Sequence, residues 1–252
     1  MTKNVELKAE NAGAYHTDAF EALAEKYAYA SQRPKSELDL MMDVSDILAN
    51  YCPDGDSTCR SGAYKATLKQ FHNGRSDEQF VIPENLDDSV RKNLGKAFDV
   101  IDTINPENVE EKIELLQKIQ NDISDLKDVS SSDQMIGVAS ISVAQESARY
   151  WTSTFSDKEH PFRGMLNRIS DTPMKNKGNR RLQVTGDLTW QQFFPIDYSE
   201  VISADTQGAI DYSIEAVNET PNLVFNFSEL FLALIAGAFP ASAAVAFNTT
   251  GL

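Results

Sequence analysis

The chain has 252 residues, with 23 Lys and Arg against 38 Asp and Glu, and carries a formal net charge of −15. This balance argues against a nucleic-acid partner, because phosphate contacts need clustered basic side chains. With only two Cys and 12 Gly, the chain is neither a cysteine-dense miniprotein nor a collagen. Its 41% hydrophobic content is enough for a buried core, in one large domain or two small ones.

Charge is distributed unevenly along the chain. Residues 1–181 hold all 23 basic residues and 30 acidic ones, whereas residues 182–252 hold eight acidic residues and no Lys or Arg. The last basic cluster lies in a turn-rich run, which fits a solvated loop, a dibasic processing site or an anion-binding spot. We predict a helical bundle over 1–170, a loop seam at 171–182, and an acidic region over 183–252 that packs on the bundle, within one continuous domain or as a second one.

The first half has apolar residues at helical spacing, which predicts helices over 18–30, 36–52, 87–104 and 106–128. Thr17 is the expected N-cap of the first helix. Asn105 and Pro106 are an N-cap and a first helical residue, so the fourth helix is expected to start there. Such a short break predicts an antiparallel αα-hairpin over about 87–128.

Small side chains dominate the stretch from 133 to 155, which ends in Tyr150 and Trp151. Because small residues let helix backbones approach closely, this stretch predicts a central, buried helix with Asp133 as its N-cap. A further helix is expected after Ser203–Asp205, which would cap it, and before Pro221. Residues 182–190 are interpreted as an extended loop. The fold class is therefore mainly α, a helical bundle with an apolar C-terminal helical region.

The run from Leu230 to Phe247 has no charged residue over 18 positions. As a helix it would be about 27 Å long, just short of a bilayer's hydrocarbon core. No Lys or Arg flanks it, so it lacks the usual orientation signals of a membrane span. We favour a segment buried in the protein core, and two alternatives stay open: a tail anchor or lipid-associated segment, and a removable anchor signal.

The sequence features that bear on cellular location conflict. The polar N-terminus lacks the apolar core of a signal peptide, which indicates a cytoplasmic start for the chain as written. Three sequons, at Asn218, Asn226 and Asn248, are candidate glycosylation sites of a secreted or surface protein. Cys52 and Cys59 enclose a turn-rich loop and are candidates for a disulfide, the alternative being two free thiols in a reducing cytosol.

Asp54 and Asp56 open a segment that begins like a calcium-binding loop. Cys59 then occupies the position that needs Gly, and Lys65 the position that needs a bidentate Glu. The segment is therefore not an EF-hand.

No other segment has the spacing of a catalytic, cofactor-binding or metal-binding motif. His16, His72 and His160 lie in loop-like contexts without a paired ligand, and we expect them on the surface. The chain contains no Gly-x-Gly-x-x-Gly, Walker A or Gly-x-Ser-x-Gly sequence. We therefore assign no catalytic, cofactor-binding or metal-ligating residue.

Three functional hypotheses follow. The first is a non-enzymatic structural or interaction protein, associated with a surface or membrane, that binds a protein partner or itself. The second is a ligand-binding module or an enzyme with a pocket at the 171–195 seam. In this hypothesis aromatic residues line the pocket; the alternative is that they pack in the core. The third is a membrane protein tail-anchored through Leu230 to Phe247.

Overall fold

The computed structural model describes residues 9–27, 37–52, 55–73, 81–156, 198–219 and 236–241. These residues are 83% helical and contain no strand, which confirms the mainly α fold class. The elements are η1 (Ala9–Asn11), α1 (Ala12–Lys26), α2 (Glu37–Ala49), α3 (Ser57–Asn73), α4 (Asp88–Ile101), α5 (Val109–Ser124), α6 (Ser131–Ser156) and α9 (Tyr198–Glu219). A further helical segment spans 236–241.

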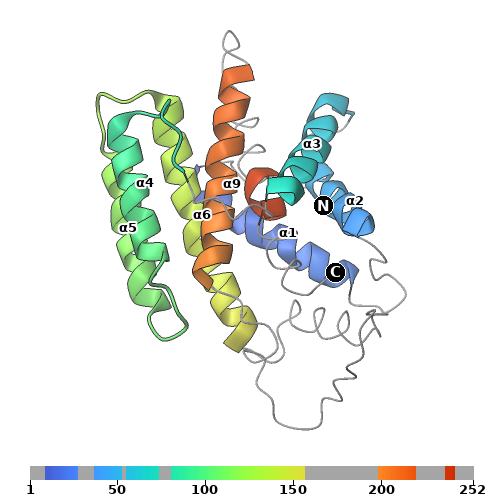
Figure 1. The fold of residues 1–252 in the computed structure, drawn as a ribbon, viewed down its shortest axis with the longest axis horizontal. Helices are drawn as coiled ribbons and strands as arrows, with labels where there is room; N and C mark the ends of the chain where they lie inside the picture. The colour runs from blue at the N-terminus through green and yellow to red at the C-terminus, as the bar shows by residue number, and fades with distance from the viewer. Residues whose placement is uncertain are drawn as a thin grey trace.

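Helices α6 and α9 lie side by side at the centre of the bundle (Figure 1). The α4–α5 pair packs against α6 on one side, and α1 packs against it on the other. Helices α2 and α3 pack on each other beyond α1, at the edge opposite α4 and α5 (Figure 1). The small-residue helix α6 thus contacts α1, α4, α5 and α9.

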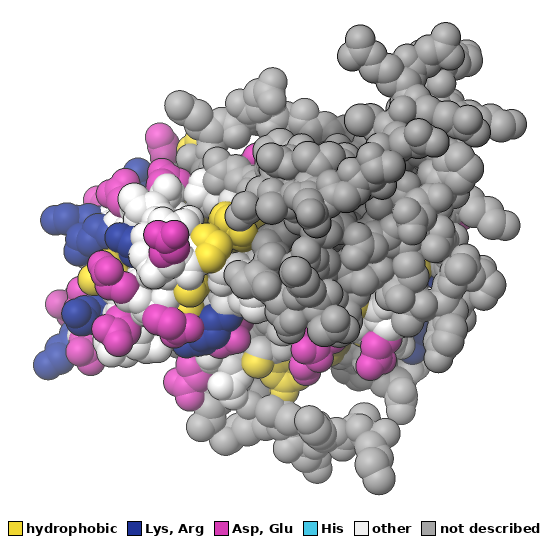
Figure 2. Space-filling view, turned by 90° about the horizontal axis from the view of Figure 1, so that it is seen from below, with side chains coloured by type: hydrophobic (Ala, Val, Ile, Leu, Met, Phe, Trp, Pro, Cys, Tyr) yellow, Lys and Arg dark blue, Asp and Glu magenta, His cyan; other side chains and the backbone are white. Residues whose placement is uncertain are grey.

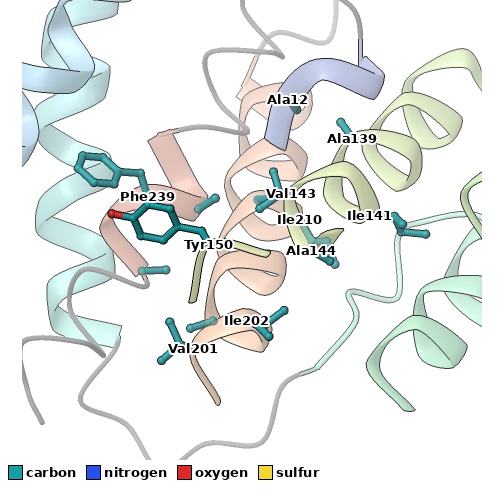
Figure 3. Close-up of a cluster of buried hydrophobic side chains, with 14 of the residues drawn as sticks. Ala12, Ala139, Ile141, Val143, Ala144, Tyr150, Val201, Ile202, Ile210 and Phe239 are labelled. Atoms are coloured by element: carbon teal, nitrogen blue, oxygen red, sulfur yellow. The ribbon is translucent and has the colours of Figure 1, made fainter. Parts of the chain in front are cut away.

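The contact between α6 and α9 contains a cluster of buried apolar side chains. Val143 and Ala144 of α6 lie beside Ile210 of α9, and all three are fully buried (Figure 3). Phe239 and Tyr150 lie at one side of this cluster, and both rings contact Phe20 of α1, with centroids 4.7 and 5.3 Å from it. The aromatic residues therefore join three helices and the 236–241 segment.

The α4–α5 pair follows its apolar periodicity closely. Asp87 caps α4 by accepting a hydrogen bond from the Ser89 backbone N–H at 2.7 Å. The prediction that α5 starts at Pro106 is wrong, because Asn105 and Asn108 first close a separate turn. The Asn108 side chain accepts from the Asn105 N–H at 2.9 Å, and the helix begins only at Val109. The surface that this pair forms carries interspersed acidic and basic side chains (Figure 2).

Two other helix starts differ from the sequence prediction, one because of a contact between elements and the other because of a local cap. Helix α1 begins at Ala12, well before Thr17, where the Gly13 N–H donates to Ser142 Oγ of α6 at 3.1 Å. Helix α6 begins at Ser131, because Ser130 Oγ accepts from the Asp133 N–H at 3.0 Å. Asp133 is thus inside α6, and its carboxylate accepts instead from the Asp87 N–H at 3.1 Å.

Helix α3 occupies a stretch for which the sequence predicted no helix. Asp56 accepts a hydrogen bond from the Cys59 backbone N–H at 3.0 Å, which makes it the N-cap of this helix. The residues that resemble the start of a calcium loop therefore include a helix-capping signal. His72 is also helical rather than in a loop.

The described part of the C-terminal apolar run lies in the core. Ala236, Ala238, Phe239 and Ala241 are at most 7% exposed. A Cβ added to Gly208 of α9 would lie 2.4 Å from the Gly237 carbonyl oxygen, so the two backbones are in direct contact. None of the helices within the described ranges is long and apolar enough to span a bilayer, and the rest of the run lies outside those ranges.

We predict opposite effects of adding one methyl group at two helical glycines. Gly208→Ala forces the α9 backbone away from residue 237, and we expect it to lower the free energy of unfolding by about 1–3 kcal/mol. In Gly95→Ala, in α4, the added Cβ would contact only Ile82 Cδ1, at 3.9 Å. Because Ala has a higher helix propensity than Gly, we expect this substitution to raise the free energy of unfolding by about 0.5–1 kcal/mol. Urea denaturation of both variants measures the difference, and equal effects would contradict the close crossing.

Candidate functional site

Asp205 is a fully buried carboxylate inside α9. The sequence placed it at the start of a helix as a capping residue, and this prediction is wrong. Helix α9 begins at Tyr198, so Asp205 lies about two turns inside it, between the buried residues Ile202 and Ala209. An ionisable side chain in this position has no water to solvate it and must find its partners within the protein.

Those partners come from two other helices. Ser147 Oγ of α6 donates a hydrogen bond to Asp205 Oδ2, and Trp151 Nε1, one turn further along α6, donates to the same oxygen at 3.3 Å. His16 Nε2 of α1 lies 3.0 Å from the other oxygen, Oδ1. We call these four residues, His16, Ser147, Trp151 and Asp205, the buried polar centre.

His16 is fully buried, so the prediction that it lies on the surface is wrong. Its separation from Asp205 is that of an ion pair, but the Nε2 and Oδ1 atoms do not align as a hydrogen bond. The contact is therefore electrostatic, and fully ionic when the imidazole is protonated. The Nδ1 atom has no hydrogen-bond partner within the described chain, and the ring packs on Phe20 at 5.0 Å between centroids.

The buried polar centre contains the residue types of a catalytic triad in a different arrangement. In a triad the serine hydroxyl bonds to histidine, and histidine bonds to the carboxylate. Here Ser147 donates to the carboxylate itself, so no imidazole is positioned to take its proton. The residues are also inaccessible, since Ser147, His16 and Asp205 are each 0% exposed. The arrangement can hold helices together but is not organised for nucleophilic attack.

A second polar group joins α3 to α9 near the surface. Lys69 pairs with Glu215, and the Tyr212 hydroxyl donates to the Gly62 carbonyl oxygen at 2.9 Å. Gln207 Nε2 donates to Asp211 Oδ1 at 2.7 Å, and burial raises the pKa of Asp211 to about 6. Glu215 adds to this rise in pKa, whereas Gln207 and Lys69 oppose it.

The structure brings together one pair of the residues that the sequence singled out. The sulfurs of Cys52 and Cys59 lie at bonding distance, 2.06 Å apart, between the end of α2 and the start of α3. Asn218 is exposed in the last turn of α9, as a glycan acceptor needs to be. Asn226 and Asn248 lie outside the described residues.

The remaining candidates fall largely outside the described chain. These are His160, Asp54, the 171–195 seam with its aromatic residues, and most of the run from Leu230 to Phe247. Within the described ranges, no three His, Cys, Asp or Glu side chains are grouped so that they could hold a metal ion.

No protein-family model, curated protein or solved structure matches this chain.

We predict that Asp205→Ala lowers the free energy of unfolding by about 3–5 kcal/mol, because it leaves the buried polar groups of α1 and α6 without a partner. Asp205→Asn is expected to cost less, since its amide oxygen can still accept from Ser147 and Trp151. Urea denaturation tests both, with the exposed Asp122→Ala as the control. A loss under about 1 kcal/mol for Asp205→Ala contradicts the role assigned to the carboxylate.

Asp211 predicts a pH dependence of stability. The folded chain keeps a proton on Asp211 up to about pH 6, whereas an unfolded aspartate releases it near 3.8, so stability falls as the pH rises between these values. At pH 7 the buried charge costs about 1–3 kcal/mol. Asp211→Asn should therefore stabilise the protein at pH 7 and flatten its urea-midpoint profile between about pH 4 and 6. An unchanged slope, as expected for the control Asp122→Asn, would refute this.

Proposed function

We propose that the protein is a non-enzymatic structural or interaction protein that works at a surface exposed to an oxidising compartment. The observation that carries the interaction role is the pair α2–α3, which exposes large apolar side chains. Leu38 and Met42 of α2 are 59% and 44% exposed, and Tyr64 of α3 is 40% exposed. Exposed apolar side chains that recur along one helix face are typical of protein-binding surfaces.

The oxidising location is supported by the cysteine pair. Disulfides persist in extracellular, periplasmic and secretory compartments and are rare in the cytosol. In the chain-entropy model, closing so short a loop stabilises the fold by roughly 2–3 kcal/mol. The exposed sequon residue Asn218 fits the same location.

The buried polar centre supports a scaffold role. The Asp205 carboxylate contacts His16 of α1 and accepts a hydrogen bond from Ser147 of α6, and the side chains of the centre have no access to solvent. In this proposal the bundle is a rigid support for the α2–α3 surface, and the interior polar residues fix the position of the helices.

The location is tested by alkylating the protein from its native source under denaturing conditions. We expect no labelled cysteine before reduction and two after it. Two labelled thiols before reduction would contradict an oxidising compartment. Intact mass of the same sample reports any glycan.

The interaction role is tested by replacing Leu38 and Met42 with Ser together. We expect the native complex to shrink on a non-denaturing gel while the melting temperature stays within a few degrees. Val81→Ser is the matched control, because Val81 is 67% exposed but lies outside α2 and α3. A complex that is unchanged by the double substitution, or equally affected by the control, argues against this surface.

A further inference from the structure

The α2–α3 pair divides its charges between the two helices. Helix α2 carries four acidic residues and no Lys or Arg, whereas α3 carries three basic residues and no Asp or Glu. The acidic residues are Glu37, Asp39, Asp43 and Asp46, and the basic ones are Arg60, Lys65 and Lys69. The cysteine pair holds the end of one helix next to the start of the other, with 5.8 Å between the Cα atoms.

Contacts inside the chain use only part of this charge. Asp43 is engaged by Lys26 and by the Tyr27 hydroxyl, and Lys69 pairs with Glu215. Asp46, Arg60 and Lys65 are exposed, and none of them forms an ion pair with another described residue. Within the described residues, one anion on α2 and two cations on α3 are therefore exposed without an ion-pair partner.

These charges lie in line with the exposed apolar residues. Leu38, Met42 and Asp46 are four residues apart and form one stripe along α2. Arg60 and Tyr64 are likewise four residues apart on α3. Each helix thus presents large apolar area next to one sign of charge, and the sign differs between the two helices.

We propose that the exposed face of the α2–α3 pair binds a second copy of the chain. In this twofold dimer, α2 of each copy packs on α3 of the other. The inference rests on the interaction role proposed above and names its partner. A twofold axis parallel to the helices brings an acidic stripe opposite a basic one twice. A partner of one charge sign would match only one of the two helices.

The positions of the charged residues along α2 and α3 agree with this pairing. Asp46 lies six residues before Cys52 and Lys65 six residues after Cys59, so the two are equally far from the cysteine pair along the chain. A twofold axis parallel to the helices preserves height. In the proposed dimer, Asp46 of one copy therefore faces the region of Tyr64 and Lys65 of the other. At physiological salt, screening over about 8 Å weakens the general repulsion between two acidic copies more than these direct contacts.

The test is a charge exchange followed by sedimentation at physiological ionic strength. We expect the unaltered protein to show a monomer–dimer equilibrium. Asp46→Lys places a cation opposite Lys65, and Lys65→Glu places an anion opposite Asp46, so each variant alone is expected to dimerise roughly tenfold more weakly. An equimolar mixture of the two variants restores both opposite-charge pairs, and we expect it to dimerise again.

Matched controls come from α5, on the other side of the bundle (Figure 1). Glu114→Lys and Lys118→Glu change the charge of exposed residues in the same way and should leave the equilibrium within about twofold. Thermal melts check that all four variants are folded.

A wild-type protein that stays monomeric up to its solubility limit overturns the dimer. So does a mixture of Asp46→Lys and Lys65→Glu proteins that associates no better than each alone. These results are separable from failure of the proposed interaction role, which the native-gel test of Leu38 and Met42 reports. A native complex that depends on Leu38 and Met42, formed by a chain that is monomeric when purified, refutes only the dimer. A native complex that is unchanged by the double substitution refutes the interaction role itself.

Discussion

Asp205 places a carboxylate where α1, α6 and α9 meet, out of reach of water. Moving such a group from water into a protein interior costs several kcal/mol unless other groups compensate it. Here α6 supplies two hydrogen-bond donors and α1 supplies an imidazole. Because each contact needs a particular residue at a particular height along its helix, the centre fixes the registers of three helices at once. Apolar packing alone tolerates more ways of sliding one helix past another.

The rest of the packing follows from the position of α1. Phe20 lies one turn after His16, and its ring contacts Trp151 of the polar centre and Phe239 of the C-terminal segment. That segment in turn crosses α9 at Gly208, where two backbones touch. A shift of α1 would therefore disturb the aromatic cluster and the glycine crossing together. Helices α2 and α3, which carry the proposed dimer surface, pack beside α1 and α9.

Periodicity in the sequence was enough to predict the helical class and the helices of the α4–α5 pair, because their apolar stripes are long and regular. Periodicity did not predict α3, because the apolar residues of this helix are not regularly spaced. The N-cap of α3, Asp56, also has the residue type of a calcium ligand. Local patterns could not predict where α1 begins, since Gly13 bonds to Ser142, a residue distant in sequence. The start of α6 is set by a local cap, Ser130, and the sequence prediction chose Asp133 instead, whose carboxylate bonds to Asp87.

The buried polar centre did leave a signal in the sequence. His16 lies four residues before Phe20, so it extends the apolar stripe of α1 by one turn. Asp205 lies three residues after Ile202 and four before Ala209, again within an apolar stripe. Polar residues in such positions are buried by the helix geometry itself. Their pairing could not be predicted, because nothing local says that α1 and α9 meet.

A double-mutant cycle measures the coupling between His16 and Asp205 directly. The free energies of unfolding are compared for the unaltered protein, His16→Gln, Asp205→Asn and the variant that carries both. If the pair fixes how α1 docks on α9, the two substitutions are coupled by at least about 1.5 kcal/mol. Effects that add to within about 0.5 kcal/mol would show that the residues act independently, and would contradict the central role of the buried polar centre.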